Sequence, residues 1–277
     1  MMQQALAVET PLHIAALAIY ALAVGLTLFG VLMSRPAFVR AGHIAAVAGL
    51  AVHSAALGLR WYGAGHGPYL TRYEVLSSNS WAAMTLFELV ALRDRRMRGL
   101  AMLIYPAALL TLGIGVYTGP EVQTLPPTFT GVWLVLHVCF YFVAFAAALL
   151  SLGYGLAHVA RDTRLLARVP ALPDRGTLDR ESYRFAGLTF AFWGIGMLTG
   201  AIWAYYSWGR FWGWDPVETW SLVTWFVYGI YLHARRFYGL RGRKAALLLL
   251  LGFVLAIGSL FFTSLLTTSL HSEYFSS

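Results

Sequence analysis

The sequence predicts an all-α fold: a polytopic integral membrane protein with about eight transmembrane helices. Hydrophobic residues make up 59% of its 277 residues, and Asp, Glu, Lys and Arg together only 12%, which excludes an ordinary soluble domain. Long apolar runs recur, each near the ~20 residues needed to cross ~30 Å of hydrocarbon. They cover residues 12–33, 42–60, 75–92, 99–117, 131–157, 185–206, 219–234 and 245–266.

The distribution of basic residues predicts the orientation of these helices, because positively charged loops resist translocation. Of the 20 Lys and Arg residues, 17 follow the first, third, fifth and seventh runs, which places those connections on the inner side. Only Arg60, Arg72 and Arg210 fall on the opposite side. The net charge of +8 therefore indicates topology and not nucleic-acid binding. We expect both termini to face outward, together with the segments near 61–74, 118–130 and 207–218.

The ends and connections of the chain add little chemistry. Residues 1–11 contain no Lys or Arg, so we expect the first run to remain as a helix and not to be cleaved as a signal peptide. The segment 158–184 mixes Asp, Pro and Arg and is expected to be a connecting loop with short amphipathic pieces. Cys139 is the only cysteine, so no disulfide can form within the chain. Residues 1–277 are thus expected to form a single transmembrane domain.

The outward segment 207–220 is unusually rich in tryptophan. Five of the ten tryptophans lie within 18 residues of one another, from Trp208 to Trp225. An aromatic belt at the membrane interface would explain any one of them. A belt does not require alternating glycines or a pair of carboxylates, however, and this segment has both. We predict Asp215 as the N-cap of the seventh helix and Pro216 in its first turn.

Such a segment presents aromatic faces and apolar edges beside an arginine and two acids. Glycines permit close approach of the backbone to a flat object. A large planar ligand with a polar fringe, such as a porphyrin with two propionates, fits this description.

The segment resembles the tryptophan-rich WWD signature of the haem-handling proteins of cytochrome c maturation, Trp-Gly-x-x-Trp-x-Trp-Asp-x-x-Glu-x-Trp. Residues 225–235, the ending 270–274 and the loop 65–74 resemble the CcsA (ResC) branch, whose members are system II cytochrome c synthases. That loop departs from the branch at Thr71 and Val75, where Asn and Ser are usual, so we expect it to have a structural role. The signature matches at Trp208, Gly209, Trp212, Trp214, Asp215, Glu218 and Trp220.

Histidine is the commonest nitrogen donor for haem iron. In the family, two outward histidines flanking the signature are paired axial ligands of an outer haem, and the resemblance implies this role for His137 and His271. His233 lies 13 residues beyond Trp220, about 20 Å deeper at 1.5 Å per residue. The resemblance implies a second haem site there, shared with a CcsB-type partner. His13, His43, His53, His66 and His158 have no such support. His53 and His66 are the next candidates, whereas His43 and His158 lie near inward ends and are expected to be interfacial.

The resemblance also implies a function. Haem b is the substrate, bound by the histidines and by Trp208, Trp212, Trp214 and Trp220, with Asp215 and Glu218 as capping and orienting groups. The chain would present haem for thioether attachment to an apocytochrome c with a Cys-x-x-Cys-His motif, as a subunit of a cytochrome c synthase (haem lyase) with a CcsB/ResB-type membrane protein. The expected location is a bacterial inner (plasma) membrane or a thylakoid-type membrane, with the active site on the outer, periplasmic side.

Three alternatives remain open. A CcmC-like or CcmF-like protein would deliver haem to a chaperone, but six helices would suit the first and many more the second. A small-molecule permease would bind no chromophore and would leave the Trp-Asp-x-x-Glu pattern unexplained. A b-type electron-transfer cytochrome would pair histidines at one depth in facing helices, which His137 and His271 do not do.

Overall fold

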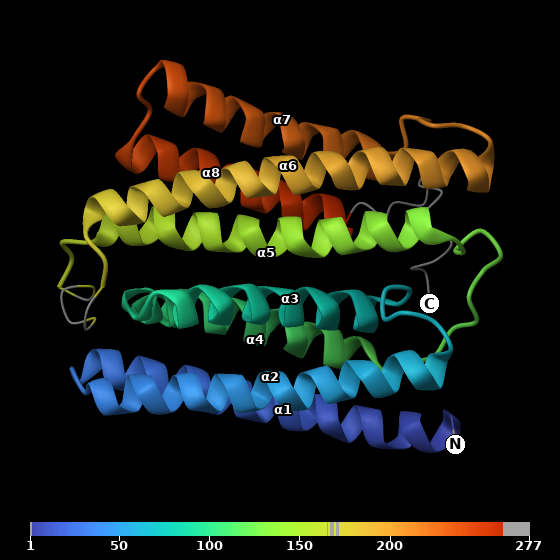
Figure 1. The fold of residues 1–277 in the computed structure, drawn as a ribbon, viewed down its shortest axis with the longest axis horizontal. Coiled ribbons are helices and arrows are strands. Elements are labelled where there is room, and N and C mark those ends of the chain that lie inside the picture. The colour runs from blue at the N-terminus through green and yellow to red at the C-terminus, as the bar shows by residue number, and fades with distance from the viewer. Residues whose placement is uncertain (1, 165, 167–168, 170–171, 263–277) are drawn as a thin grey trace. The chain divides into compact units, whose positions relative to one another are not determined.

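The computed structural model describes residues 2–164, 166, 169 and 172–262, and all regular structure in this part of the chain is helical (Figure 1). The predicted all-α class and the predicted eight helices are confirmed. Seven of these helices are long and apolar enough to cross a membrane, whereas α7 is less apolar. The helices are α1 (Met2–Leu32), α2 (Pro36–Ala64), α3 (Arg72–Arg93), α4 (Ala101–Thr118), α5 (Val132–Ala160), α6 (Arg175–Trp208), α7 (Pro216–Phe237) and α8 (Gly242–Ile257).

Two helices begin ten residues earlier than the apolar runs predict. α1 starts ten residues before position 12, and its polar first turns are accommodated because Glu9 and His13, one turn apart, pair at 2.8 Å. α6 starts at Arg175, so the connection after α5 is shorter than the predicted segment 158–184. The polar start of α6 is held by Asp179, which forms an ion pair with Arg235 of α7. Apolar content alone therefore marks the membrane core of a helix and not its ends.

The described chain forms two compact units. Unit 1 comprises Met1–Thr124 with Ala160–Arg175, and unit 2 comprises Leu125–Val159 with Gly176–Ser277. Unit 1 therefore holds α1 to α4, and unit 2 holds α5 to α8, including the tryptophan-rich segment. Each unit contains several helices of membrane-spanning length.

In unit 1, α1 and α2 lie side by side and run in opposite directions (Figure 1). Small residues line their buried faces, including Ala16, Ala23 and Ala46, which are fully buried. Small side chains let membrane helices approach closely, so that packing replaces the hydrophobic drive that lipid cannot supply. Thr71 is the N-cap of α3 and forms a reciprocal capping box with Glu74, so the departure from the family pattern at position 71 keeps a structural role.

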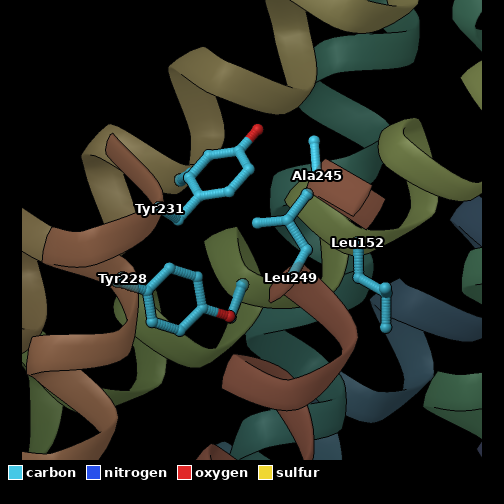
Figure 2. Packing of buried hydrophobic residues seen from close by; sticks show 7 residues of the cluster. Leu152, Tyr228, Tyr231, Ala245 and Leu249 are labelled. Carbon is cyan, nitrogen blue, oxygen red and sulfur yellow. The ribbon is translucent and has the colours of Figure 1, made fainter. Parts of the chain in front are cut away.

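In unit 2, buried side chains of all four helices pack together. Figure 2 shows Leu249 of α8 between Tyr228 and Tyr231 of α7 on one side and Leu152 of α5 on the other, and Ala245 of α8 belongs to the same cluster. Ala186 of α6 belongs to the same cluster. This packing fixes α7 against α8, and so fixes the start of α7, which follows the tryptophan-rich segment.

Candidate functional site

The turn between α6 and α7 is built by the two acids of the signature. Asp215 is the N-cap of α7 and accepts a hydrogen bond of 2.8 Å from Val217 N. Glu218 Oε2 accepts from Gly213 N at 2.8 Å and from Asp215 N at 3.2 Å. The predicted N-cap and the predicted place of Pro216 in the first turn are confirmed. Both carboxylates thus hold the backbone of the turn in one conformation. They also lie at the N-terminus of α7, where the positive end of the helix dipole stabilises their negative charge.

The glycines of the turn have distinct reasons to be glycine. Gly209 has φ +72°, a left-handed conformation that ends α6 without steric cost. Gly213 lies under the guanidinium of Arg210, and a Cβ there would come 2.7 Å from Arg210 Nε and Nη2. The exposed cation therefore sits directly above the backbone of the turn.

The tryptophans of the turn present large aromatic faces at the surface of unit 2. Trp214 is 70% exposed and Trp220 is 44% exposed. The Trp212 and Trp214 rings stand nearly perpendicular, with centroids 5.8 Å apart. These rings give an apolar surface that can contact the membrane interface and can also contact a planar ligand.

His137 lies on α5 with its ring against α6. Its Nδ1 donates a hydrogen bond of 2.8 Å to the backbone oxygen of Gly196. A carbonyl can only accept, so in the neutral ring the proton is on Nδ1 and the lone pair is on Nε2. The ring also covers Gly200, where an added Cβ would overlap it. Gly200 therefore leaves the space for this ring, and the Gly196 carbonyl orients it.

A row of aromatic rings connects His137 with the first tryptophan of the signature. The Trp203 ring is stacked near His137, with centroids 6.1 Å apart and planes inclined by 26°. The Trp203 and Trp208 centroids are 4.9 Å apart in an edge arrangement. Trp203 is 3% exposed, and its Nε1 donates to the Thr128 backbone oxygen at 2.8 Å. The structure thus brings His137 and Trp208 to one end of α5 and α6.

Trp203 is the residue of this row that the sequence does not reveal. It stands five positions before Trp208, outside the signature, and a tryptophan near a helix end is typical of any membrane interface. Its position just over one turn from Trp208 was the only available indication.

The other predicted iron ligands do not join His137 within the described residues. His233 lies near the far end of α7, exposed, with its ring centroid 4.5 Å from that of Phe237. His271 lies outside the described residues. Across residues 2–164, 166, 169 and 172–262, no group of three or more His, Cys, Asp or Glu side chains is arranged to hold a metal ion.

The remaining histidines of unit 1 are buried and hydrogen-bonded. His66 Nδ1 donates to the Gly67 backbone oxygen at 2.8 Å and holds the loop between α2 and α3. His13 and His53 both contact the hydroxyl of Ser77 on α3, each at 2.8 Å. The sequence gives no indication that these two rings meet.

Comparison with known proteins identifies the family. Residues 69–271 match the family described as Cytochrome C assembly protein. The CcsA cytochrome c biogenesis protein of Synechococcus sp. (strain CC9902) is 33% identical over 269 residues, covering 86% of this chain and 87% of that protein. The CcsA protein of Chlamydomonas reinhardtii is 32% identical over 228 residues, covering 78% of this chain and 64% of that protein.

Among solved structures, the cytochrome c haem lyase CcmF has the same fold, with a TM-score of 0.68 at 19% sequence identity. The match covers 98% of this chain and 51% of that chain, so this chain spans about half of CcmF and less than two thirds of the Chlamydomonas protein. The match to the family extends over the tryptophan-rich turn, the aromatic row and most of unit 2, and in unit 1 it covers α3 and α4 but not α1 and α2. The chain therefore belongs to the cytochrome c assembly protein family and is an integral membrane protein of cytochrome c biogenesis, similar to the CcsA proteins.

Proposed function

We propose that unit 2 binds haem b as a substrate and presents it at the outer membrane face for attachment to apocytochrome c. The observation that carries this proposal is the hydrogen bond from His137 Nδ1 to the Gly196 carbonyl. Histidines that ligate metals almost always donate their other ring nitrogen in this way, which fixes the tautomer and raises the basicity of the ligating nitrogen. Nε2 of His137 is thus prepared to bind haem iron.

The tryptophans supply the apolar wall of the proposed site. Trp208, Trp212, Trp214 and Trp220 offer flat surfaces suited to a porphyrin, and the row through Trp203 connects them with His137. Arg210 lies above the turn and offers a cation for a propionate. Asp215 and Glu218 do not act as acid–base catalysts in this proposal, because backbone N–H groups already use their carboxylates.

The contribution of the chain to the reaction is positioning. Each thiol of a Cys-x-x-Cys-His segment adds across one vinyl group, so that sulfur bonds to one vinyl carbon and the thiol hydrogen goes to the other. No electrons are gained or lost overall. Holding reactants in near-attack geometry can supply ~7–11 kcal/mol of the barrier, so the chain needs no catalytic base to act as a subunit of a cytochrome c synthase. His271 is the proposed second axial ligand, and the histidine of the apocytochrome would replace one of the two.

The proposed partner is a CcsB/ResB-type membrane protein. His233 is exposed on α7, a helix less apolar than the other seven. An exposed histidine on such a helix supports a contact with protein and not with lipid alone. We propose that His233 and a ligand from the partner hold haem before it reaches the outer site, in a bacterial inner membrane or a thylakoid-type membrane.

Visible spectroscopy of the purified protein, alone and with its CcsB-type partner, tests this proposal. The wild type should show a low-spin haem spectrum that weakens in His137→Ala and His271→Ala and recovers when imidazole is added. His233→Ala should lose only haem that depends on the partner. His158→Ala, near the other end of α5, is the matched control and should keep the full spectrum. A wild type without haem under either condition would refute the proposal and favour a permease.

A further inference from the structure

A row of buried polar side chains runs through the helices of unit 1. Its members are at most 5% exposed, although they lie on helices that are long and apolar enough to cross a membrane. Ionisable groups inside a membrane are costly and commonly form ion pathways or proton relays. The Glu9 cluster comprises Glu9, His13, Tyr20, His53, Tyr73 and Ser77, and the Glu88 cluster comprises His43, Glu88 and Tyr105.

The hydrogen bonds nearest Glu9 have a fixed direction. His13 Nδ1 lies 2.8 Å from a carboxylate oxygen of Glu9, which can only accept. In neutral His13, Nε2 then carries the lone pair and accepts from the Ser77 hydroxyl at 2.8 Å. Ser77 has a single hydroxyl proton and donates it to His13 Nε2.

The same direction continues away from Glu9. Ser77 Oγ accepts from His53 Nε2, which is also 2.8 Å away. His53 Nδ1 therefore carries the lone pair and accepts from the Tyr20 hydroxyl at 3.2 Å. In this row of hydrogen bonds, each group donates to the neighbour that is nearer to Glu9. Successive proton transfers require this arrangement.

The Glu88 cluster is a separate hydrogen-bonded group on α2, α3 and α4. Tyr105 Oη contacts both Glu88 Oε1 and, at 2.6 Å, His43 Nδ1. His43 Nε2 lies 3.3 Å from the Arg98 backbone oxygen.

We propose that α1, α2 and α3 form a proton path that leads from the Tyr20 hydroxyl, through His53, Ser77 and His13, to the carboxylate of Glu9. As a proton is taken up at the oxygen of Tyr20, the Tyr20 hydroxyl proton moves to His53 Nδ1. The Nε2 proton of His53 moves to Ser77, the Ser77 proton to His13 Nε2, and the Nδ1 proton of His13 to Glu9. One proton is transferred in total, and no bond between heavy atoms changes.

The charges around Glu9 indicate that the path ends there. Arg60 Nη1 is 3.8 Å from Glu9 Oε2, and Arg60 Nε donates to Glu74 Oε1 at 2.8 Å. With neutral histidines, the buried set of Arg60, Glu9 and Glu74 has a net charge of −1, which one added proton neutralises. Tyr73 donates to Glu9 at 2.7 Å and holds this carboxylate at the end of the row. A fixed guanidinium beyond Glu9 repels further protons, as in pores that exclude them.

Infrared difference spectroscopy tests the path in vesicles containing the full chain with 13C-labelled glutamate. After a rapid drop in pH, the wild type should show an infrared band of protonated glutamate. The substitution Glu9→Gln should abolish this band. Ser77→Ala removes the hydroxyl that joins the two histidines and should slow the appearance of this band at least about tenfold, because transfer across a broken chain is slow. Ser77→Thr keeps a hydroxyl and should retain the wild-type rate.

Ser80→Ala is the matched control, since Ser80 lies on the same helix, is equally buried and donates to the Ala108 backbone oxygen outside the path. Its band should appear at the wild-type rate. Equal rates in Ser77→Ala and Ser80→Ala, or the absence of any band that depends on Glu9, would overturn the proposal. If Ser77→Ala does not fold, Tyr20→Phe replaces it in the test. This variant lacks the hydroxyl that donates to His53, so it should slow the appearance of the band in the same way. The inference does not rest on the proposed haem site, because none of these substitutions touches His137, and the haem spectrum reports on that site separately.

Discussion

The substitution Gly200→Ala tests whether the packing of the His137 ring against α6 is needed for haem binding. A Cβ at this position would overlap the imidazole ring, and its neighbours are ring atoms of His137 and no flexible chain end. The ring must therefore turn away or α5 must move from α6. In either case the hydrogen bond from His137 Nδ1 to the Gly196 carbonyl is lengthened or lost.

The size of the effect follows from the cost of overpacking. An additional methyl group in a well-packed interior typically costs 1–3 kcal/mol, which corresponds to about 5-fold to 150-fold in an equilibrium constant. Alanine also favours a helix over glycine by roughly 0.5–1 kcal/mol, which acts in the opposite direction. We therefore expect haem affinity to fall about 5-fold to 150-fold while α6 remains folded.

The assay is a haem titration of the purified protein, followed through the low-spin absorption band. Gly187→Ala is the control, because it lies on the same helix and a Cβ there has no neighbour within 4 Å. Gly187→Ala should bind haem like the wild type, and added imidazole should restore the spectrum of Gly200→Ala. Equal affinities in the two variants would show that the orientation of His137 against α6 has no part in haem binding.

Three other substitutions test the supports of the site. Glu218→Gln replaces a charged acceptor of two backbone N–H groups and should cost about 1–2 kcal/mol of turn stability, seen as faster proteolysis between α6 and α7. Trp203→Phe loses the indole N–H bond to a backbone carbonyl and should weaken haem binding several-fold in the same titration, with unchanged helix content by circular dichroism. Asp179→Asn breaks the largely buried pair with Arg235 and should lower the melting temperature, whereas Glu181→Gln, whose arginine partner is exposed, should not.

The sequence predicts the helices well because a membrane allows few alternatives. An apolar run of about 20 residues must satisfy its own backbone, so composition is enough to place all eight helices. The ends of α1 and α6 are less predictable, since Glu9 and Asp179 stay helical through partners that lie far away in the sequence. The cap at Asp215 is predictable because Pro216 follows it directly and the capping geometry is local.

Parts of the candidate site depend on contacts between helices and are not predictable in this way. Nothing near His137 in the sequence indicates that its ring rests on Gly196 and Gly200, about 60 positions later. The row in unit 1 is a similar case. His13 and His53 appear as isolated histidines until the packing of α1, α2 and α3 brings both to Ser77.

The backbone of Trp214 has a consequence for how this turn is used. Its φ is +56°, a left-handed conformation that costs roughly 1–2 kcal/mol for any residue except glycine. A glycine here would relax the chain, yet the position carries an indole that is 70% exposed and therefore contributes little to the fold. A large side chain kept in a conformation that disfavours it, and turned toward the surroundings, indicates an external contact for which the protein gives up some of its own stability.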